Sequence, residues 1–192
     1  MLPSAVLSLT FYTKKITMKK KISLVLLCCG LLTAGSLEAQ QDKSKRPSPP
    51  ATATQTLESG ATITIEYSQP SVKGRTIGDN LEPKKDKVWR MGANEATVFD
   101  ASKDVMVEGK ALPAGRYSLF GLWGDDGFTL IFNSASKIWG TQYDQNKDKD
   151  VLRVNVKPRT TTTTQEQLVY SIDKTGLVTM LWGTMAVDFT VK

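Results

Sequence analysis

The feature that most constrains this chain is a two-residue alternation of apolar and polar side chains. In Ala61–Tyr67 every second residue from Ile63 onward is apolar, namely Ile63, Ile65 and Tyr67, and the residues between them are polar. Successive side chains of a β-strand point to opposite faces, so this pattern predicts a half-buried strand rather than a helix. Similar runs follow over residues 88–91, 96–101, 105–108, 116–123, 128–133, 151–157, 167–173, 177–182 and 186–191.

Turn-forming residues separate these runs. Asp-Gly and related sequences suit the positive φ angles of tight hairpins, and such segments occur at 108–110, 113–115, 125–127, 173–176 and 183–184. Only Asn133–Trp139 has room for a short helix, and Thr160–Thr164 is expected to be a loop or an edge strand. We therefore predict an all-β fold, an antiparallel β-sandwich or flattened barrel of about ten short strands.

The N-terminus has the order of a secretory signal peptide. Lys19–Lys21 precede the apolar run Ile22–Leu32, and small and polar residues follow up to Ala39. We expect residues 1–39 to be the signal peptide, with the true start at Met18 and cleavage near Ala39. The apolar run is shorter than the roughly 20 residues that span a bilayer, so we expect no membrane span in the mature form.

Lipidation of Cys28 or Cys29 is the alternative to simple cleavage. A lipoprotein signal has a small residue before the modified cysteine, whereas Leu27 precedes Cys28. We favour cleavage, which would remove both cysteines and leave a mature chain without Cys or His. We expect that chain to be periplasmic or extracellular, with no disulfide framework.

Two further segments follow the predicted signal. Residues 40–54 are polar and proline-rich, which predicts a disordered linker, and residues 55–192 form the single predicted domain. The whole chain has 25 basic and 19 acidic residues, of which 8 and 2 lie in residues 1–54, so residues 55–192 carry 17 of each. This balance argues against a nucleic-acid partner.

Six segments of the chain together resemble one family. They are Tyr67–Arg75, Val88–Thr97, Leu112–Phe120, Phe132–Asn133, Trp139–Gly140 and Asp150–Val154. Over about residues 55–192 the chain is similar to the domain of unknown function 2911 family, found in exported proteins of Gram-negative bacteria. The resemblance implies no known activity or substrate. Met91 stands where the family usually has Thr, and Ile77–Leu81 lacks the Phe-Gly-Gly-like filling of the family.

The densest group of polar and aromatic residues lies in and near the Trp-Arg segment. This group also includes Lys73. Its predicted ligand-binding residues are Arg75, Trp89, Arg90, Asn94 and Glu95. An indole beside Arg, Asn and a carboxylate can stack on a sugar ring and bind its hydroxyls. The competing interpretation is structural, with the indole in the core and the polar groups satisfying one another.

We therefore expect an exported, non-catalytic domain that binds a small polar or saccharide ligand and needs no cofactor. One alternative is a carboxylate-dependent hydrolase that pairs Glu95 with Asp100 or Glu66. Another is a purely structural envelope protein. Without His or Cys, the mature chain has no Ser-His-Asp triad and no imidazole or thiolate zinc site.

Three other patterns carry weaker signals. Asp144–Asp150 has the oxygen-rich spacing of a calcium loop, but Lys149 occupies the position that needs Gly, so we expect a solvated loop and no metal. Ser134–Lys137 and Lys174–Gly176 match short motifs of penicillin-recognising enzymes by chance. The aromatic residues Trp123, Phe128, Trp139 and Trp182 are expected in the core.

Overall fold

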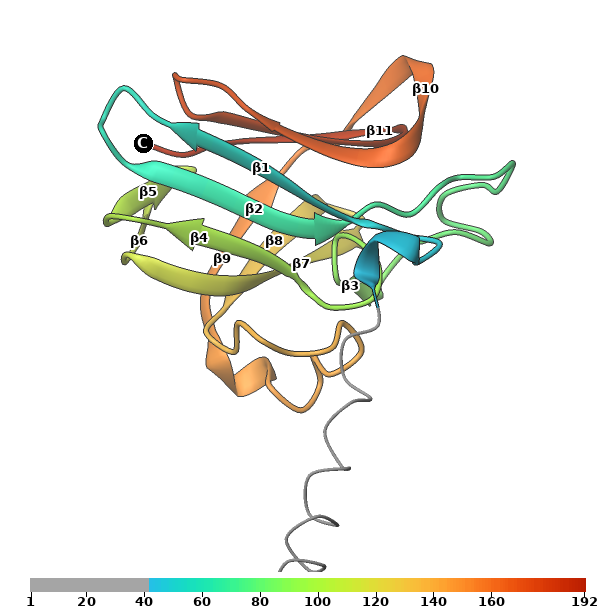
Figure 1. Cartoon of the computed structure of the whole chain (residues 1–192), viewed down its shortest axis with the longest axis horizontal. Coiled ribbons are helices and arrows are strands. Elements are labelled where there is room, and N and C mark those ends of the chain that lie inside the picture. The colour runs from blue at the N-terminus through green and yellow to red at the C-terminus, as the bar shows by residue number, and fades with distance from the viewer. Residues whose placement is uncertain (1–41) are drawn as a thin grey trace, which may run out of the picture. The chain divides into compact units, whose positions relative to one another are not determined.

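The described part of the chain, residues 42–192 of a computed structural model, is built from antiparallel strands (Figure 1). The predicted signal peptide, with Cys28 and Cys29, lies outside the described residues. The main sheet has the order β1 (Pro50–Thr56), β2 (Thr62–Ser68), β4 (Thr97–Ala101), β7 (Gly115–Gly124), β8 (Gly127–Asn133) and β9 (Asp150–Val156), and β3 (Val88–Trp89) pairs with β7.

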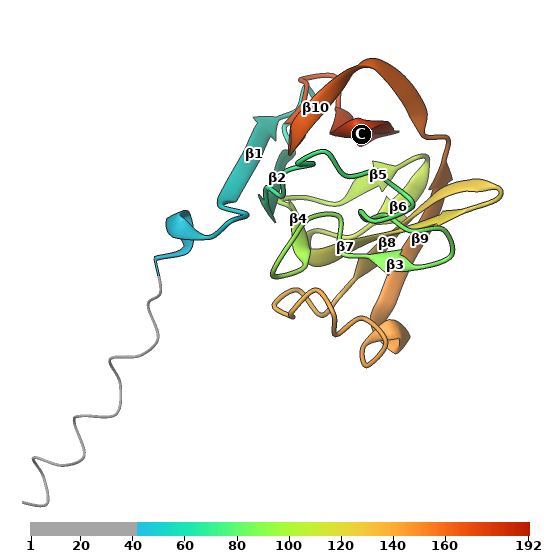
Figure 2. The same cartoon turned by 90° about the vertical axis from the view of Figure 1, so that its right-hand side faces the viewer.

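A long hairpin forms the second layer. Strands β10 (Arg159–Ile172) and β11 (Leu177–Thr190) pair only with each other in their sheet and lie across one face of the main sheet (Figures 1 and 2). A small hairpin, β5 (Val105–Val107) and β6 (Lys110–Leu112), completes the strands. The predicted all-β antiparallel architecture is confirmed, and the main sheet is open rather than closed into a barrel.

Within residues 42–192 there is no α-helix, only the 3₁₀ turns η1 (Lys43–Lys45) and η2 (Lys147–Lys149). None of the helical segments in this part of the chain has the length or the apolar character to cross a membrane.

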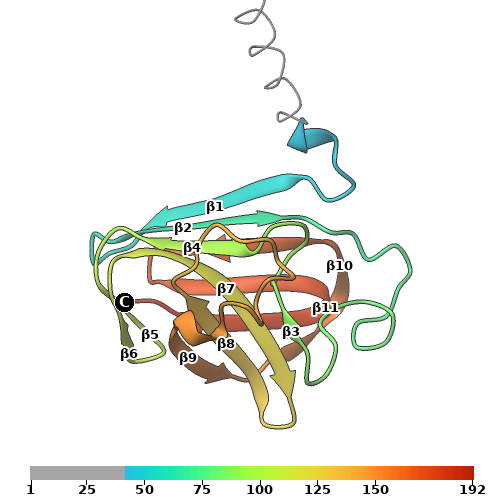
Figure 3. The ribbon, with the colours of Figure 1, turned by 90° about the horizontal axis from the view of Figure 1, so that it is seen from below.

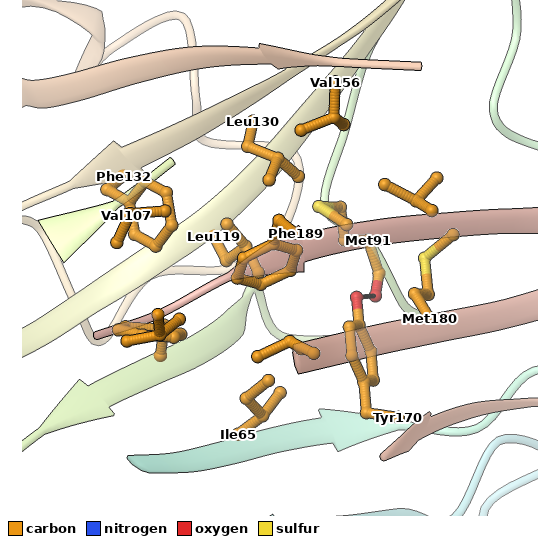
Figure 4. Packing of buried hydrophobic residues seen from close by; sticks show 14 of the residues in the cluster. Ile65, Met91, Val107, Leu119, Leu130, Phe132, Val156, Tyr170, Met180 and Phe189 are labelled. Atoms are coloured by element: carbon orange, nitrogen blue, oxygen red, sulfur yellow. Dashed lines mark hydrogen bonds between the residues drawn. The ribbon is translucent and has the colours of Figure 1, made fainter. Parts of the chain in front are cut away.

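The core lies between the main sheet and the β10–β11 hairpin. Phe99 of β4 and Phe132 of β8 meet edge to face, with ring centroids 5.1 Å apart, and Phe189 of β11 packs on both at 6.5 Å (Figure 4). Full burial of each aromatic side chain stabilises the fold by about 1.5–3 kcal/mol. Phe128 and Trp182 are also buried, as predicted.

The opposite face of the main sheet is covered in part by the segment between β8 and β9. Phe120 and Ile131 point to this face and form a second apolar cluster with Tyr143, whose ring centroid lies 4.9 Å from that of Phe120. The strands β7 and β8 are therefore apolar on both faces, which fixes the covering segment against the sheet.

Strand β1 begins inside the segment that was predicted to be a disordered linker. Residues 50–54 pair with β2 from Pro50 opposite Ser68 onward, and alternate residues such as Ala51 and Ala53 are partly buried. Pro50 is tolerated because it is the first residue of an edge strand (Figure 3). The proline content of this segment led to the linker prediction. The alternation of the strand was not apparent because its inward-facing residues are small.

Two other local predictions were wrong. The predicted turn at Gly183–Thr184 lies inside the continuous strand β11, where Gly183 adopts a left-handed φ of 56°. The pairing of β10 with β11 shifts register there, between Thr160 and Gln165, so the glycine serves an irregularity within the ladder rather than a reversal. Asn133–Trp139 contains no helix, because Asn133 ends β8 and the following backbone is held by side-chain hydrogen bonds.

Candidate functional site

The motif loop, residues 90–96, connects β3 to β4 and is preceded by Trp89. The indole of Trp89 is only 4% exposed and belongs to the main core, where its Nε1 donates to the carbonyl of Gly92 at 3.2 Å. Neither ring face is free for a ligand. The structure therefore gives Trp89 the structural role that the sequence had left as the competing interpretation.

Met91 and Thr97 anchor the motif loop to the core. The Met91 carbonyl accepts hydrogen bonds from the hydroxyls of Thr97, at 3.0 Å, and Tyr170, at 2.9 Å (Figure 4). Met91 is fully buried and has a left-handed φ of 51°. Burial raises the pKa of the Tyr170 hydroxyl, which therefore remains a donor at ordinary pH. These bonds tie the loop to the β10–β11 hairpin.

Arg90 packs against the segment that follows β8. A Cβ on Gly140 would overlap the side-chain carbons of Arg90, so only glycine fits there. Burial lowers the pKa of the Arg90 guanidinium, and the charge of Glu82 partly offsets this. Its Nε is buried and has no hydrogen-bond partner among the described residues. Arg90 does not line the cleft described below.

Asn94 connects the sheet to the N-terminal strap, residues 42–49. With a left-handed φ of 59°, Asn94 donates through Nδ2 to the carbonyl of Ser48 at 3.0 Å and to Oγ of Ser68 at 3.2 Å. Asparagine tolerates this backbone conformation better than most residues. Its amide is used for structure, and it fixes the end of the strap beside β2.

Arg75 lies in a different loop. Its Nε and Nη2 donate to the carbonyls of Val72 and Ser71, at 3.0 and 2.6 Å, so the guanidinium closes its own turn. This turn is attached to β10, because Val72 N donates to Glu166 O at 2.8 Å and Lys73 N to the Glu166 carboxylate at 2.9 Å. Neither basic residue lines the cleft.

Glu95 is the one predicted site residue that borders a cleft. Arg46 Nη1 lies 3.0 Å from both carboxylate oxygens, and Lys43 Nζ lies 3.0 Å from Oε1. Partial burial opposes ionisation, but the backbone amide of Glu95 and these two cations outweigh it and lower the pKa of Glu95 to about 2. Glu95 is therefore ionised at neutral pH and is held by the strap.

The cleft has a volume of about 480 Å³ and lies over β2 and β4, where Glu66, Ser68 and Val98 line it. The strap and the cleft loop, residues 134–142, form its other walls. Its lining comprises Lys43, Arg46, Pro50, Glu66, Tyr67, Ser68, Glu95, Ala96, Val98, Arg116, Ser136, Lys137, Ile138 and Trp139. Trp139, which the sequence predicted to be in the core, is 45% exposed here. Its backbone N–H and C=O form hydrogen bonds within the protein, and the residue borders the cleft.

Backbone hydrogen bonds fix the cleft loop next to the motif loop. Ala96 N donates to Ile138 O at 3.1 Å, and Gly140 N donates to Asn94 O at 3.1 Å. Trp139 N donates to the Gln142 side chain at 2.8 Å, and Gln142 N returns a bond to Trp139 O at 2.9 Å. The Trp139 side chain is thus presented from a backbone that is held on both sides.

An ion-pair network borders the cleft through Glu66 and Arg116. Arg116 of β7 reaches Glu66 of β2 and Asp100 of β4, each at 2.8 Å. The hydrogen bonds and charge of Glu66, the larger contribution, and of Asp100 raise the pKa of Arg116 against partial burial. The two carboxylates named as possible partners of Glu95 are therefore both bound to one guanidinium.

The acidic segment before β9 is organised around protein groups. Asp150 accepts from Asn133 Nδ2 at 2.8 Å, from the Tyr143 hydroxyl at 2.7 Å and from Arg153 Nη2 at 2.8 Å. Burial and the Asp150 charge raise the pKa of Tyr143 to about 12. In residues 42–192 no group of three or more His, Cys, Asp or Glu side chains is arranged to hold a metal ion.

Sequence reasoning missed Lys137, Trp139 and Arg116 as cleft residues. Trp139 follows an apolar residue, Ile138, and tryptophan is usually buried, so nothing local distinguished it from a core residue. Two signals were available, its polar setting close to Lys137 and its place in Trp139–Gly140, one of the segments that carry the family resemblance.

The comparisons with known proteins add a family. The model of a family described as Protein of unknown function (DUF2911) matches residues 48–191. No curated protein and no solved structure gives a match to the chain. The match includes the motif loop and the cleft loop, whereas Lys43 and Arg46 of the strap lie before it.

Proposed function

The chain belongs to the DUF2911 family of proteins of unknown function, and from that premise we propose that it is an exported, non-catalytic domain that binds a small polar or saccharide ligand in the cleft. The observation that carries this proposal is the half-exposed indole of Trp139 at the wall of a cleft rich in charged and hydroxyl groups. Indoles stack on the apolar face of a sugar ring, and nearby polar groups bind its hydroxyls.

Export is the second part of the proposal. Its support is the sequence order of Lys19–Lys21, the apolar run Ile22–Leu32 and the small residue Ala39. We propose that cleavage near Ala39 releases the chain into the periplasm or outside the cell. Mass spectrometry of the cell-associated and secreted product tests it, since retention of Cys28 or Cys29 contradicts cleavage at this site.

Binding is tested by isothermal titration of the purified protein with a panel of envelope saccharides and small polar acids. Replacing the indole, Trp139→Ala, should weaken binding at least tenfold. Val151→Ala is the matched control, because Val151 is a similarly exposed apolar residue that does not line the cleft. Binding that survives Trp139→Ala unchanged rules out this site.

A carboxylate-dependent hydrolase is the second candidate, because Glu66 and Glu95 line the same cleft. Glycoside hydrolysis needs one carboxylic acid that remains protonated near the working pH. Glu95, with a pKa of about 2, could act only as the ionised partner, and Glu66 is bound bidentately by Arg116. Hydrolysis of chromogenic glycosides that Glu95→Gln abolishes would favour this candidate over binding alone.

A purely structural role is the third candidate, and the contacts of Trp89 and Met91 favour it for the motif loop. The titration of the unchanged protein separates this role from ligand binding, because a purely structural domain would bind no member of the panel.

A further inference from the structure

The charges around the cleft are paired except for one. Glu95 is held by Lys43 and Arg46, and Arg116 is held by Glu66 and Asp100. Together these six side chains have no net charge. Lys137, which also lines the cleft, has no ion pair or side-chain hydrogen bond among the described residues. Asp100 itself does not line the cleft, so the lining carries four cations against two carboxylates, and Lys137 is the one cation among them that no carboxylate of residues 42–192 holds.

The backbone around Lys137 is fixed on both sides. Before it, the Ala135 carbonyl accepts from Ser118 Oγ at 2.6 Å, and Ala135 N donates to Asn133 Oδ1 at 2.9 Å. After it, the Ile138 carbonyl accepts from Ala96 N at 3.1 Å. A ligand would pay little to order this segment, because the protein has already ordered it.

Lys137 lies two residues before Trp139, and both border the same cleft. The pair offers one flat apolar surface and one unpaired ammonium group. A neutral sugar would use only the first, whereas a sugar with an anionic substituent would use both.

We infer that the cleft selects acidic saccharides, with the sugar ring on the indole of Trp139 and its anionic group on the ammonium of Lys137. This inference rests on the proposed saccharide-binding function and narrows it to one class of ligand. Carboxylate, sulfate and phosphate substituents share the required chemistry. The other three lining cations are already bound to carboxylates, so the unpaired ammonium of Lys137 is the group that we assign to the anion.

The test is calorimetric titration of the full chain with trigalacturonate, with its methyl ester as the neutral match and with a sulfated galactose trisaccharide. At low salt the two acidic ligands should bind about tenfold tighter than the ester, a difference of about 1.4 kcal/mol. Sodium chloride at 200 mM should reduce this preference, because the charges involved are accessible to solvent.

Lys137→Gln should lower the affinity for the acidic ligands to that of the ester and leave the ester unchanged. Lys147→Gln is the matched control, since Lys147 lies in the same β8–β9 segment but does not line the cleft. Trp139→Ala should weaken all three ligands. A preference for one acidic substituent identifies which anionic group the cleft takes.

Equal binding of acid and ester by the unchanged protein overturns the inference but leaves the proposed function standing. A preference that survives Lys137→Gln, or that Lys147→Gln also removes, overturns it as well. Failure of all three ligands to bind at millimolar concentration also overturns the inference, whereas the proposed function fails only if no member of the wider panel binds.

Discussion

The motif loop and the cleft loop are neighbours joined by two backbone hydrogen bonds, yet their side chains are used in opposite ways. In the motif loop, the side-chain amide of Asn94 donates hydrogen bonds to the protein itself, and so does the indole N–H of the preceding Trp89. In the cleft loop the backbone forms the hydrogen bonds to the protein, and the side chains of Lys137 and Trp139 stay available for a ligand. The motif loop therefore mainly supports the site, and the available side chains belong to the cleft loop beside it.

The largest effect that this comparison predicts is the loss of Trp89. Trp89→Ala removes a nearly fully buried indole, so we expect the free energy of unfolding to fall by about 3–5 kcal/mol. Urea denaturation followed by circular dichroism measures it. The fraction that remains folded should bind saccharide with unchanged affinity. A cost below 1 kcal/mol would contradict the structural role of this residue.

The next effect concerns the anchor of the motif loop. Tyr170→Phe removes one of two hydroxyls that donate to the buried Met91 carbonyl, so we expect a loss of about 1–2 kcal/mol. Thr97→Val removes the other. Because both share one acceptor, the double variant should depart from additivity by at least about 0.5 kcal/mol. Additive losses would show that the two hydroxyls act independently.

A smaller and pH-dependent effect is expected at Glu95, where the two loops meet the strap. The fold lowers the pKa of Glu95 from 4.5 to about 2, so its ionised form stabilises the folded protein. This contribution is fully present above the ordinary pKa and is lost as the pH falls towards 2. Its size is below about 1 kcal/mol, because the side chain is 38% exposed and solvent screens the pairs.

Melting temperatures of the unchanged protein and Glu95→Gln, measured at pH 7, 4 and 2.5, test this expectation. The difference should be largest at pH 7 and should shrink at each step down. Glu58→Gln, at an exposed glutamate with no ion pair in residues 42–192, is the control and should change the melting temperature at none of the three. A difference that grows on acidification would reverse the assigned sign.

The smallest effect on stability is expected at Trp139. Its indole is half-exposed and its position is set by backbone bonds, so Trp139→Ala should change the free energy of unfolding by less than about 0.5 kcal/mol. The same variant has the largest expected effect on ligand affinity. Thermal unfolding measures the first quantity, and a loss of 2 kcal/mol or more would place Trp139 with the structural residues.

Much of the architecture could be predicted from alternation alone. Strand β2 follows it closely, because one face packs on the hairpin and the other does not. Strand β1 was missed because its inward residues are alanines, which carry little hydrophobic signal. The turn predicted at Gly183 was wrong because a glycine with a positive φ can occur at a register shift within a strand as well as in a turn. The sequence alone does not distinguish the two.

The candidate site was harder to predict because it depends on which side chains are left over. Arg75 and Arg90 have the chemistry of ligand-binding residues, but one closes its own turn and the other packs on Gly140. Glu95 borders the cleft, and its prediction as a ligand-binding residue rested only on its place in the motif. Whether a tryptophan is in the core depends on tertiary contacts, and for Trp139 those contacts involve the distant segment at Asn94.

The strap has a consequence for how such domains diversify. It supplies Lys43 and Arg46 to the cleft, although these two residues precede the segment that the family model matches. Family members that keep the sheet, the hairpin and Glu95 but differ in the residues before position 48 would have a cleft of altered polarity. Ligand selectivity can then evolve by the exchange of a few residues in the strap, without any change in the sheet or the hairpin.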